Sequence, residues 1–283
     1  MGIGAEAAGA VVLAGGRSSR MGTPKAALEW HGSTLLHRTT ALLARTVGGP
    51  VVVVAAPGQD LPALPAGVTV VEDPVEGRGP MQGIAGGLGA LAEKAPAAFV
   101  CSTDLPFLHP AYVRRVLGAL GDTDAAVPLA RGFRQPLAAG YRTALGEIAA
   151  ALAAEGSLKL GRLFERCRVR WLTEDDLLAD PDVARHDPHL DSLVNVNEPA
   201  DYAAARARPP ADVVVECVAA PASRGRRGPV TAPVATLGAA AAAVGLDLDR
   251  HVVALNGDRT GRDPHIPLVS GDRVSFLPAD AAG

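Results

Sequence analysis

The amino-acid sequence predicts an α/β protein whose main sheet is followed by a small second domain. Short apolar runs alternate with segments in which leucine and alanine repeat at helical spacing, and the links between them are short. The first apolar run ends abruptly in a glycine-rich turn. Residues 206–212 change to arginine, proline and alanine, which is typical of a linker. We therefore expect one domain over residues 1–208 and a second over residues 209–283.

Each expected element depends on a local pattern. Runs of β-branched and small apolar residues predict strands in the first domain at residues 10–13, 50–55, 68–71, 98–102, 125–129, 136–141 and 169–172. Helical spacing predicts helices at residues 34–45, 84–93, 112–120, 143–154, 158–166 and 199–206. In the second domain we expect strands at residues 213–218, 251–255 and 273–277 around one helix, which Thr236 caps and Gly245 ends. In such a chain, ligands bind at the carboxyl ends of the strands.

The composition limits the classes of partner. The 283 residues are 48% hydrophobic and 20% charged, which suits a packed core. A formal net charge of −3 gives no general reason to expect nucleic acid or a membrane as a partner. Cys101, Cys167 and Cys217 are widely spaced, which favours a reduced protein without a cysteine zinc site. With no signal-peptide pattern or membrane-length apolar run in the sequence, we expect a cytoplasmic protein.

The stretch VVLAGGRSSRMGTPK, from Val11 to Lys25, carries the main functional signal. Its glycines let successive backbone N–H groups approach an anion, and its cations add donors that suit phosphate. The glycines are Gly15, Gly16 and Gly22, and the cations are Arg17, Arg20 and Lys25. The spacing excludes a Walker loop, and a Gly-x-Gly-x-x-Ala string at Gly2 precedes the strand instead of following it. These residues predict a phosphate-binding loop at the carboxyl end of the first strand.

The same stretch resembles the signature LAGG-x-S-x-RMG-x-x-K of nucleotidyltransferases, specifically the molybdenum cofactor guanylyltransferase family. The matching residues are Leu13, Ala14, Gly15, Gly16, Ser18, Arg20, Met21, Gly22 and Lys25. The resemblance covers roughly residues 9–206. It implies a Rossmann-like nucleotidyltransferase sheet with helices on both faces.

The resemblance also implies a reaction and a set of site residues. It implies transfer of GMP from GTP to the terminal phosphate of molybdopterin, with release of pyrophosphate and a need for Mg²⁺. Lys25, Arg20 and Asp104 would act in catalysis. The nucleotide-binding residues that it implies are Leu13, Ala14, Gly15, Gly16, Arg17, Lys25, Asp73, Gly79, Gly83 and Asp104. Partners would be GTP, molybdopterin and other proteins of molybdenum cofactor synthesis or recipient molybdoenzymes.

Two residues are candidate metal ligands. Asp104 follows a predicted strand in Cys-Ser-Thr-Asp-Leu-Pro, where a carboxylate can hold Mg²⁺ beside substrate phosphates. By itself, Asp104 is better explained as a cap of the turn before Pro106, and only the resemblance favours the metal ligand. Of Asn195 and Asn197 in Val-Asn-Val-Asn-Glu-Pro, we expect only one to face the site. Asn197 resembles the asparagine that completes the metal site in related transferases, but it could also cap the next helix.

Two further segments are candidates for substrate contacts. Asp73 and the turn from Gly79 to Gly83 resemble the family's nucleotide pocket, although an ordinary surface turn is the alternative. The segment Arg-Gly-Phe-Arg-Gln-Pro-Leu resembles the part that faces the second substrate, where Arg134 and Gln135 could bind the phosphate of the pterin. A solvated hairpin is the alternative for this segment.

A cluster of histidines and aspartates carries no metal assignment. It contains His186, Asp187, His189 and Asp191. Because prolines interrupt it and no regular element fixes its spacing, we expect a solvated loop.

The second domain resembles the ubiquitin-like β-grasp fold of molybdopterin-synthase small subunits and thiamine sulfur carriers. The resemblance lies in VALNGD at residues 253–258 and in GDRVSFLPADAAG at the end. Sulfur carriers end in Gly-Gly, whereas this sequence ends in Ala-Gly. We therefore expect that Gly283 is not adenylated or thiocarboxylated efficiently.

Two alternatives to guanylyl transfer stay open. A sister transferase would use CTP or a sugar phosphate, but related cytidylyltransferases carry LAAG where this sequence has LAGG, which favours guanine. Against guanine, this chain has Val54-Ala55-Ala56 where the family often has an asparagine after its second strand. The other alternative is a non-catalytic nucleotide-binding or carrier-like partner centred on the second domain.

Overall fold

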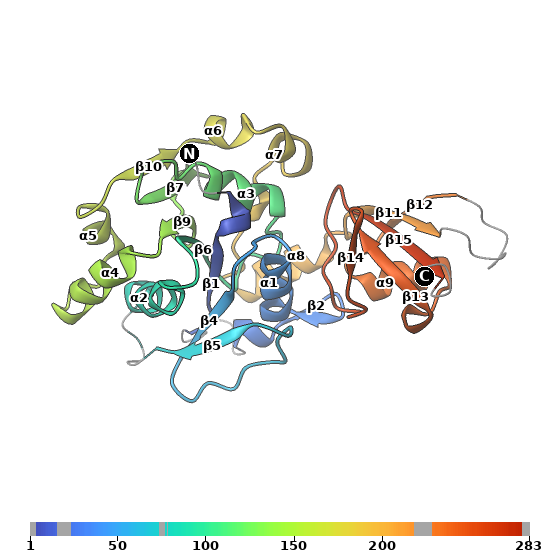
Figure 1. The fold of residues 1–283 in the computed structure, drawn as a ribbon, viewed down its shortest axis with the longest axis horizontal. Helices are drawn as coiled ribbons and strands as arrows, with labels where there is room; N and C mark the ends of the chain where they lie inside the picture. The colour runs from blue at the N-terminus through green and yellow to red at the C-terminus, as the bar shows by residue number, and fades with distance from the viewer. Residues whose placement is uncertain (1–3, 16–23, 74–76, 78, 218–227, 279–283) are drawn as a thin grey trace. The chain divides into compact units, whose positions relative to one another are not determined.

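The computed structural model describes residues 4–15, 24–73, 77, 79–217 and 228–278 (Figure 1). The chain divides into two compact units, Met1–Glu29 with Thr34–Ala203, and Trp30–Ser33 with Ala204–Gly283. The expectations for several residues fall outside the described ranges. These residues are Gly2, Gly16, Arg17, Ser18, Arg20, Met21, Gly22 and Gly283.

The first unit is built on an eight-stranded sheet of described residues with the order β10-β7-β9-β6-β1-β4-β5, in which β8 pairs with β7. Its strands are β1 (Gly9–Leu13), β4 (Val51–Ala55), β5 (Thr69–Glu72), β6 (Ala97–Ser102), β7 (Ala125–Ala130), β8 (Phe133–Arg134), β9 (Ala138–Arg142) and β10 (Val169–Leu172). β1 is parallel to β4 and β6, while β9 is antiparallel to both β6 and β7. β6 and β7 therefore run in the same direction, and the carboxyl ends of β4, β1, β6 and β7 meet at one edge of the sheet, which we call the site edge.

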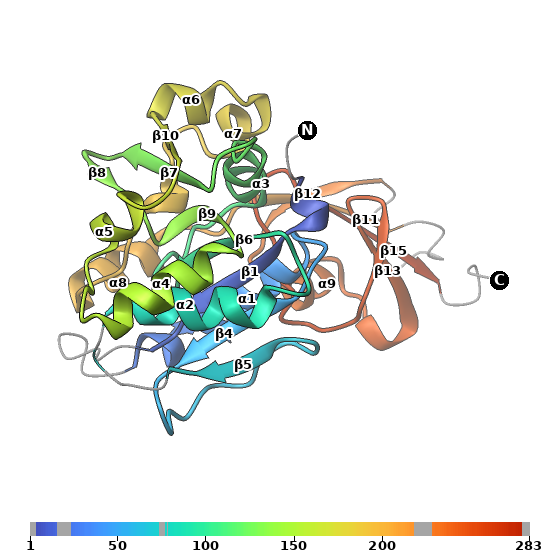
Figure 2. The same cartoon turned by 60° about the vertical axis from the view of Figure 1, so that its left-hand side comes forward.

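Helices α2 (Pro80–Leu91) and α4 (Leu145–Ala154) cover one face of this sheet and lie side by side in both views (Figures 1 and 2). Their apolar side chains share one core with the sheet residues Val11, Val54 and Val100. Two glycines of α2 allow the close approach to β1, because a Cβ on Gly87 would clash with Val11 and one on Gly83 would meet Leu13 Cδ2 at 3.0 Å. The start of α2 is thereby held against the carboxyl end of β1.

The opposite face carries α1 (Leu35–Ala44) and α3 (Pro110–Gly118). The Tyr112 ring of α3 meets Phe99 of β6 edge to face at 6.2 Å, and its hydroxyl donates to the Ala138 carbonyl at 2.8 Å. Sheet and helices on both faces confirm the predicted α/β class.

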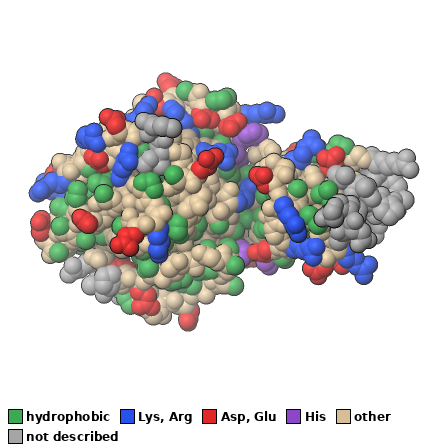
Figure 3. Space-filling model, viewed as in Figure 1, with side chains coloured by type: hydrophobic (Ala, Val, Ile, Leu, Met, Phe, Trp, Pro, Cys, Tyr) green, Lys and Arg blue, Asp and Glu red, His purple; other side chains and the backbone are tan. Residues whose placement is uncertain are grey.

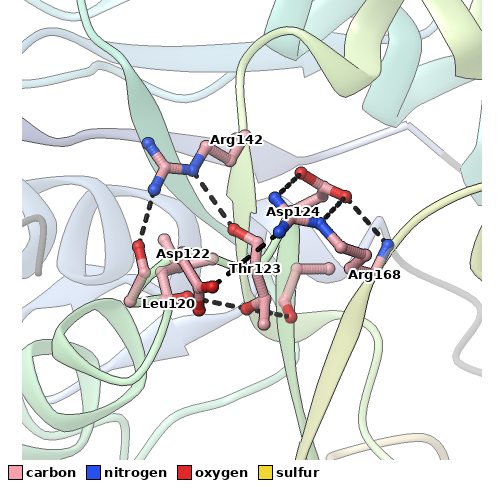
Figure 4. A network of polar contacts seen from close by, with 8 residues as sticks. Leu120, Asp122, Thr123, Asp124, Arg142 and Arg168 are labelled. Carbon is pink, nitrogen blue, oxygen red and sulfur yellow. Dashed lines mark hydrogen bonds and ion pairs between the residues drawn. The ribbon is translucent and has the colours of Figure 1, made fainter.

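The edge opposite the site edge is held by a polar network (Figure 4). The Asp124 carboxylate, just before β7, accepts the Arg168 backbone N–H at 2.8 Å, and the Arg168 guanidinium contacts the same carboxylate. These contacts, above all the backbone hydrogen bond from Arg168, lower the pKa of Asp124 below its usual value. Arg142 donates to the carbonyls of Gly121 and Thr123. The network thus joins the starts of β7 and β10.

The described residues 25–207 also contain further short elements. They are the pairing strands β2 (Glu29–Trp30) and β3 (Ser33–Thr34), and the helices α5 (Leu160–Phe164), α6 (Glu174–Leu178), α7 (Pro181–His186) and α8 (Pro199–Ala207). α6 and α7 were not predicted, although Thr173 and Asp176 form a capping box at α6. The expected helix at residues 84–93 begins earlier, at Pro80, because proline is tolerated at the first helical position.

The second unit contains a mixed sheet with one helix. Its strands are β11 (Asp212–Cys217), β12 (Val230–Pro233), β13 (His251–Leu255), β14 (Asp258–Thr260) and β15 (Arg273–Pro278), in the order β12-β11-β15-β13-β14. β11 and β15 are parallel, and the other pairs are antiparallel. The helix α9 (Leu237–Val244) packs onto this sheet in a separate core, with Thr236 as its N-cap and Gly245 in the left-handed conformation, as predicted.

Acidic and basic side chains are interspersed on the face shown in Figure 3. Within the described part of the chain, every helix is too short or too polar to cross a membrane.

Candidate nucleotide-binding site

Three predicted site residues meet at the site edge although they are far apart in the sequence. Lys25 starts a short 3-10 helix (Lys25–Ala27), Asp104 lies two residues after β6, and Asn197 precedes α8. The Lys25 Nζ atom donates to Asp104 Oδ2 at 3.0 Å and to Asn197 Oδ1 at 2.9 Å. The Lys25 and Asp104 side chains are only 21% and 15% exposed, so solvent screens this ion pair less than a pair on the open surface.

The Asp104 carboxylate is held from a second side. Ser102, the last residue of β6, donates its hydroxyl to Asp104 Oδ1. The Asp104 carbonyl accepts the Val196 backbone N–H at 2.9 Å, which joins the end of β6 to the segment before Asn197. Both carboxylate oxygens of Asp104 therefore have a defined hydrogen-bond donor.

A residue other than Asn197 caps the start of α8. The Asp201 carboxylate accepts the backbone N–H groups of Asn197 and Glu198, at 3.0 and 2.9 Å, and so caps the start of α8. Asn197 is thus free of a capping role, and its side-chain oxygen faces Lys25. Asn195 instead donates to the Leu193 carbonyl at 3.3 Å.

A pocket of about 340 Å³ opens beside the cluster formed by Lys25, Asp104 and Asn197. It is lined by Leu13, Gly15, Val54, Ala55, Ala56, Asp73, Gly77, Gly79, Pro80, Gly83, Ser102 and Leu137. Five of these were predicted from the sequence to bind nucleotide, namely Leu13, Gly15, Asp73, Gly79 and Gly83. Ser102 lines the pocket and also donates its hydroxyl to Asp104. It therefore connects the pocket with the cluster of Lys25, Asp104 and Asn197.

The backbone around the pocket requires glycine at two positions, Gly15 and Gly79. A Cβ on Gly15 would lie 3.2 Å from the Ala56 nitrogen, so the end of β1 could not approach β4 as closely with a larger residue. Gly79 has φ 73° and ψ −175°, a conformation that essentially only glycine adopts, and it turns the chain into α2. The start of α2 therefore borders the pocket, and unpaired N–H groups at a helix start attract anions.

Gln59 is a residue that sequence reasoning missed. Its Oε1 atom accepts the Ala56 backbone N–H at 2.9 Å, and its Nε2 atom donates to the Ala14 carbonyl at 3.1 Å. Gln59 thereby ties the end of β1 to the end of β4 at the wall of the pocket. It lies near the place where the family often has an asparagine. Neither a motif nor a periodicity in the sequence points to it.

Arg134 and Gln135 do not line this pocket. The Arg134 guanidinium carbon lies 4.6 Å from the centroid of the Trp171 ring, and Gln135 Nε2 donates to the Ala130 carbonyl of its own hairpin at 3.1 Å. Leu137, two residues beyond Gln135, does line the pocket. The segment thus borders the site while these two side chains point to other partners.

The expectation of a solvated loop at residues 186–191 is wrong in part. His186 is the last residue of α7, and its ring stacks on His109 at 5.6 Å. Asp187 is buried and accepts the backbone N–H groups of Asp191 and Ser192. Burial raises the pKa of Asp187 to about 6, although these hydrogen bonds oppose the rise.

The donor atoms at the cluster suit Mg²⁺ better than a metal that needs a full set of protein ligands. Among the described residues, no group of three or more His, Cys, Asp or Glu side chains gathers at one point. Asp104 and Asn197 offer one carboxylate and one amide oxygen, and Mg²⁺ commonly binds to one or two protein oxygens together with substrate phosphates and water.

Comparison with known proteins identifies the family of this chain. The family model of the MobA-like NTP transferase domain matches residues 10–171. A probable molybdenum cofactor guanylyltransferase of Mycobacterium tuberculosis H37Rv is 40% identical over 159 residues, which are 55% of this chain and 78% of that protein. Another, from Bacillus cereus AH820, is 30% identical over 199 residues, 69% of this chain and 94% of that protein.

Solved structures show the same fold. Molybdopterin-guanine dinucleotide biosynthesis protein A from Archaeoglobus fulgidus has a TM-score of 0.54 at 22% identity, over 70% of this chain and 96% of that one. Rv0371c from Mycobacterium tuberculosis H37Rv has a TM-score of 0.51 at 20% identity, over 71% and 98%. The chain therefore belongs to the MobA-like NTP transferase family, alongside the molybdenum cofactor guanylyltransferases, and is a nucleotidyltransferase.

Proposed function

We propose that the first unit transfers GMP from GTP to the terminal phosphate of molybdopterin. A phosphate oxygen of molybdopterin attacks the α-phosphorus of GTP, the bond from this phosphorus to the bridging oxygen breaks, and pyrophosphate leaves with that oxygen. The attacking group is already an anion and needs little activation. Catalysis then depends on alignment of two negative groups and on neutralisation of their charge.

The observation that carries this proposal is the meeting of Lys25, Asp104 and Asn197 beside a pocket that ends at Ser102. The guanine and ribose would occupy the pocket between Gly15, Asp73 and Gly83. The triphosphate would then extend toward Lys25 and the glycine-rich loop, with Arg20 as a second cation. Asp104 and Asn197 would hold Mg²⁺, which supplies charge neutralisation at the phosphates when it is bound.

The direct test of this proposal is a turnover assay with purified protein, molybdopterin and Mg²⁺ in which GTP, CTP and sugar phosphates are compared. We expect pyrophosphate and a guanine dinucleotide of molybdopterin with GTP, and at most slow turnover with CTP. CTP turnover that equals or exceeds GTP turnover would instead identify a cytidylyltransferase. Tight GTP binding without turnover would identify the non-catalytic alternative.

For the second unit we propose the β-grasp assignment, with a domain boundary near residues 208 and 209. A mixed sheet that packs a single helix on one face supports it, as does the separation of the compact units at Ala203 and Ala204.

A further inference from the structure

An exposed surface at the end of the sheet combines apolar and cationic side chains. Trp171 of β10 is 36% exposed, and Leu129 of β7 is 44% exposed. Arg134 of β8 lies over the Trp171 ring at 4.6 Å, and Phe164 supports the ring from the edge at 5.5 Å. We call Leu129, Arg134 and Trp171 the indole surface. Large apolar side chains that stay exposed together mark binding sites more often than isolated ones do.

The indole surface lies on the same face of the sheet as the nucleotide pocket. Val127 and Val169 belong to the core beneath α2 and α4, and Leu129 and Trp171 follow each of them by two residues. Side chains two residues apart on a strand point to the same face, and register pairs Leu129 with Arg134. By the same rule Ser102 shares the face of Val100, which belongs to that core.

The chain connects the surface to the pocket along the site edge. Leu137 lines the pocket, and its carbonyl accepts the Ser102 backbone N–H at 3.3 Å. Arg134 precedes Leu137 by three residues in the same β8–β9 segment. From β6 to β10 the sheet crosses β9 and β7, which is three strand spacings or about 14 Å.

This separation decides which part of the second substrate the surface can bind. The reacting phosphate must lie next to the α-phosphate of GTP, and hence near Asp104 and the pocket. Arg134 itself lies on β8, which pairs with β7, but its guanidinium is turned onto Trp171 of β10 and away from Ser102, so we expect it to contact a part of the substrate other than that phosphate. A planar guanidinium stacked on an indole is instead suited to a flat conjugated ring.

We propose that the indole surface binds the pterin ring system of the second substrate, which stacks on the Arg134 guanidinium and packs against Leu129. The Trp171 ring holds the guanidinium in place from below. The molybdopterin phosphate then points along the site edge toward Ser102. This inference depends on the proposed function, because it takes the second substrate to be a pterin phosphate.

Intrinsic fluorescence can report on this site directly. The chain has two tryptophans, and Trp30 is 2% exposed. In a Trp30→Phe background, Trp171 is the only indole emitter. We would titrate this protein with 6-hydroxymethylpterin monophosphate, with 6-hydroxymethylpterin and with inorganic phosphate, with correction for absorption by the pterins. If Trp30→Phe fails to fold, the same titrations are run on the unmodified chain with Trp171→Phe as the reference.

The expected result is saturable quenching of Trp171 emission by both pterins and none by inorganic phosphate. Arg134→Ala and Arg134→Lys should each weaken the pterin affinity about tenfold, because lysine keeps the charge but loses the plane that stacks on the ring. Phe133→Ala is the matched control: this residue is 73% exposed in the same strand, its side chain points to the other face, and its loss should leave the affinity unchanged.

Three results would overturn the inference. They are quenching by phosphate alone, full rescue by Arg134→Lys, and equal losses in Phe133→Ala and Arg134→Ala. Failure of the proposed function is recognised separately, since it would abolish GTP-dependent pyrophosphate release with molybdopterin in the unmodified protein. Normal turnover with an unchanged KM for molybdopterin in Arg134→Ala would reject the indole surface and leave the guanylyltransferase proposal intact.

Discussion

The Lys25 ammonium forms a direct ion pair with Asp104, at 3.0 Å from the Oδ2 atom, and it also bonds the Asn197 side-chain oxygen. Lysine thus occupies the two oxygen atoms that we propose as metal ligands. A cation on the protein neutralises the carboxylate before substrate arrives. In the proposed reaction, binding of the triphosphate would give Lys25 other anionic partners, and the carboxylate would then become available to Mg²⁺.

Replacement of Lys25 by alanine should therefore change metal affinity and turnover in opposite directions. In the nucleotide-free protein, Lys25→Ala should bind Mn²⁺ about fivefold more tightly, because the competing ion pair contributes roughly 1 kcal/mol. Turnover should fall about a hundredfold through loss of charge stabilisation at the phosphates. Electron paramagnetic resonance measures the free Mn²⁺ and hence the Mn²⁺ affinity. Lys94→Ala, which changes the net charge by the same amount, is the control. Unchanged or weaker Mn²⁺ binding would show that Lys25 does not compete with the metal.

Ser102 should act as a positioning residue for Asp104. Ser102→Ala removes the hydroxyl that donates to Asp104 Oδ1, and the loss of one hydrogen bond of about 1 kcal/mol should lower kcat about fivefold. The melting temperature should change little, because Ser102 lies at the surface of the pocket. Ser102→Thr keeps the hydroxyl and should restore part of the rate. Equal kcat values for the unmodified protein, Ser102→Ala and Ser102→Thr would show that Ser102 does not position Asp104.

Two neighbouring glycines of α2 should respond to alanine in opposite ways. Nothing lies within 4 Å of a Cβ on Gly86, so Gly86→Ala should stabilise the helix by up to about 1 kcal/mol. A Cβ on Gly87 would clash with Val11, and Gly87→Ala should destabilise the fold by about 1–3 kcal/mol. Urea unfolding of the two variants measures both effects. Equal stabilities would show that α2 does not depend on this close approach to β1.

Asp187 should make stability depend on pH. Its folded pKa of about 6 exceeds the ordinary value of 3.8, so between these values the folded state binds more protons than the unfolded state. Stability should then fall as the pH rises through this window, by about 3 kcal/mol relative to Asp187→Asn. Unfolding free energies of both proteins at several pH values provide the test, because the other carboxyl groups cancel in the comparison. Parallel curves would contradict the burial of an ionisable carboxyl at this position.

Local patterns in the sequence predicted the longer strands and most helices, because each of these elements has its own periodicity. Strand β10, for instance, covers residues 169–172 as expected, and Thr236 and Gly245 bound α9 as their capping preferences predict. Local patterns did not predict the short strands β2, β3, β8, β12 and β14. The resemblance to a family located Lys25, Asp104 and Asn197. Local patterns alone did not decide whether Asp104 and Asn197 bind a metal or cap a turn and a helix.

The partners of these residues could not be predicted, because they depend on long-range contacts. Lys25 and Asn197 are 172 positions apart, and no local pattern records their hydrogen bond. Gln59 bonds Ala14 across 45 positions, and Arg134 stacks on Trp171, which belongs to another strand. The burial of Asp187 likewise follows from the packing around α7 and not from its polar sequence neighbours.

The most direct test is a crystal structure with a non-hydrolysable GTP analogue and Mn²⁺, in which anomalous scattering locates the metal. The account predicts a Mn²⁺ peak in contact with the Asp104 carboxylate and a guanine base in the pocket beside Asp73 and Gly83. It also predicts that the Lys25 ammonium has moved from Asp104 to the phosphates. A metal peak away from Asp104, or a Lys25–Asp104 ion pair that persists with nucleotide bound, would contradict it.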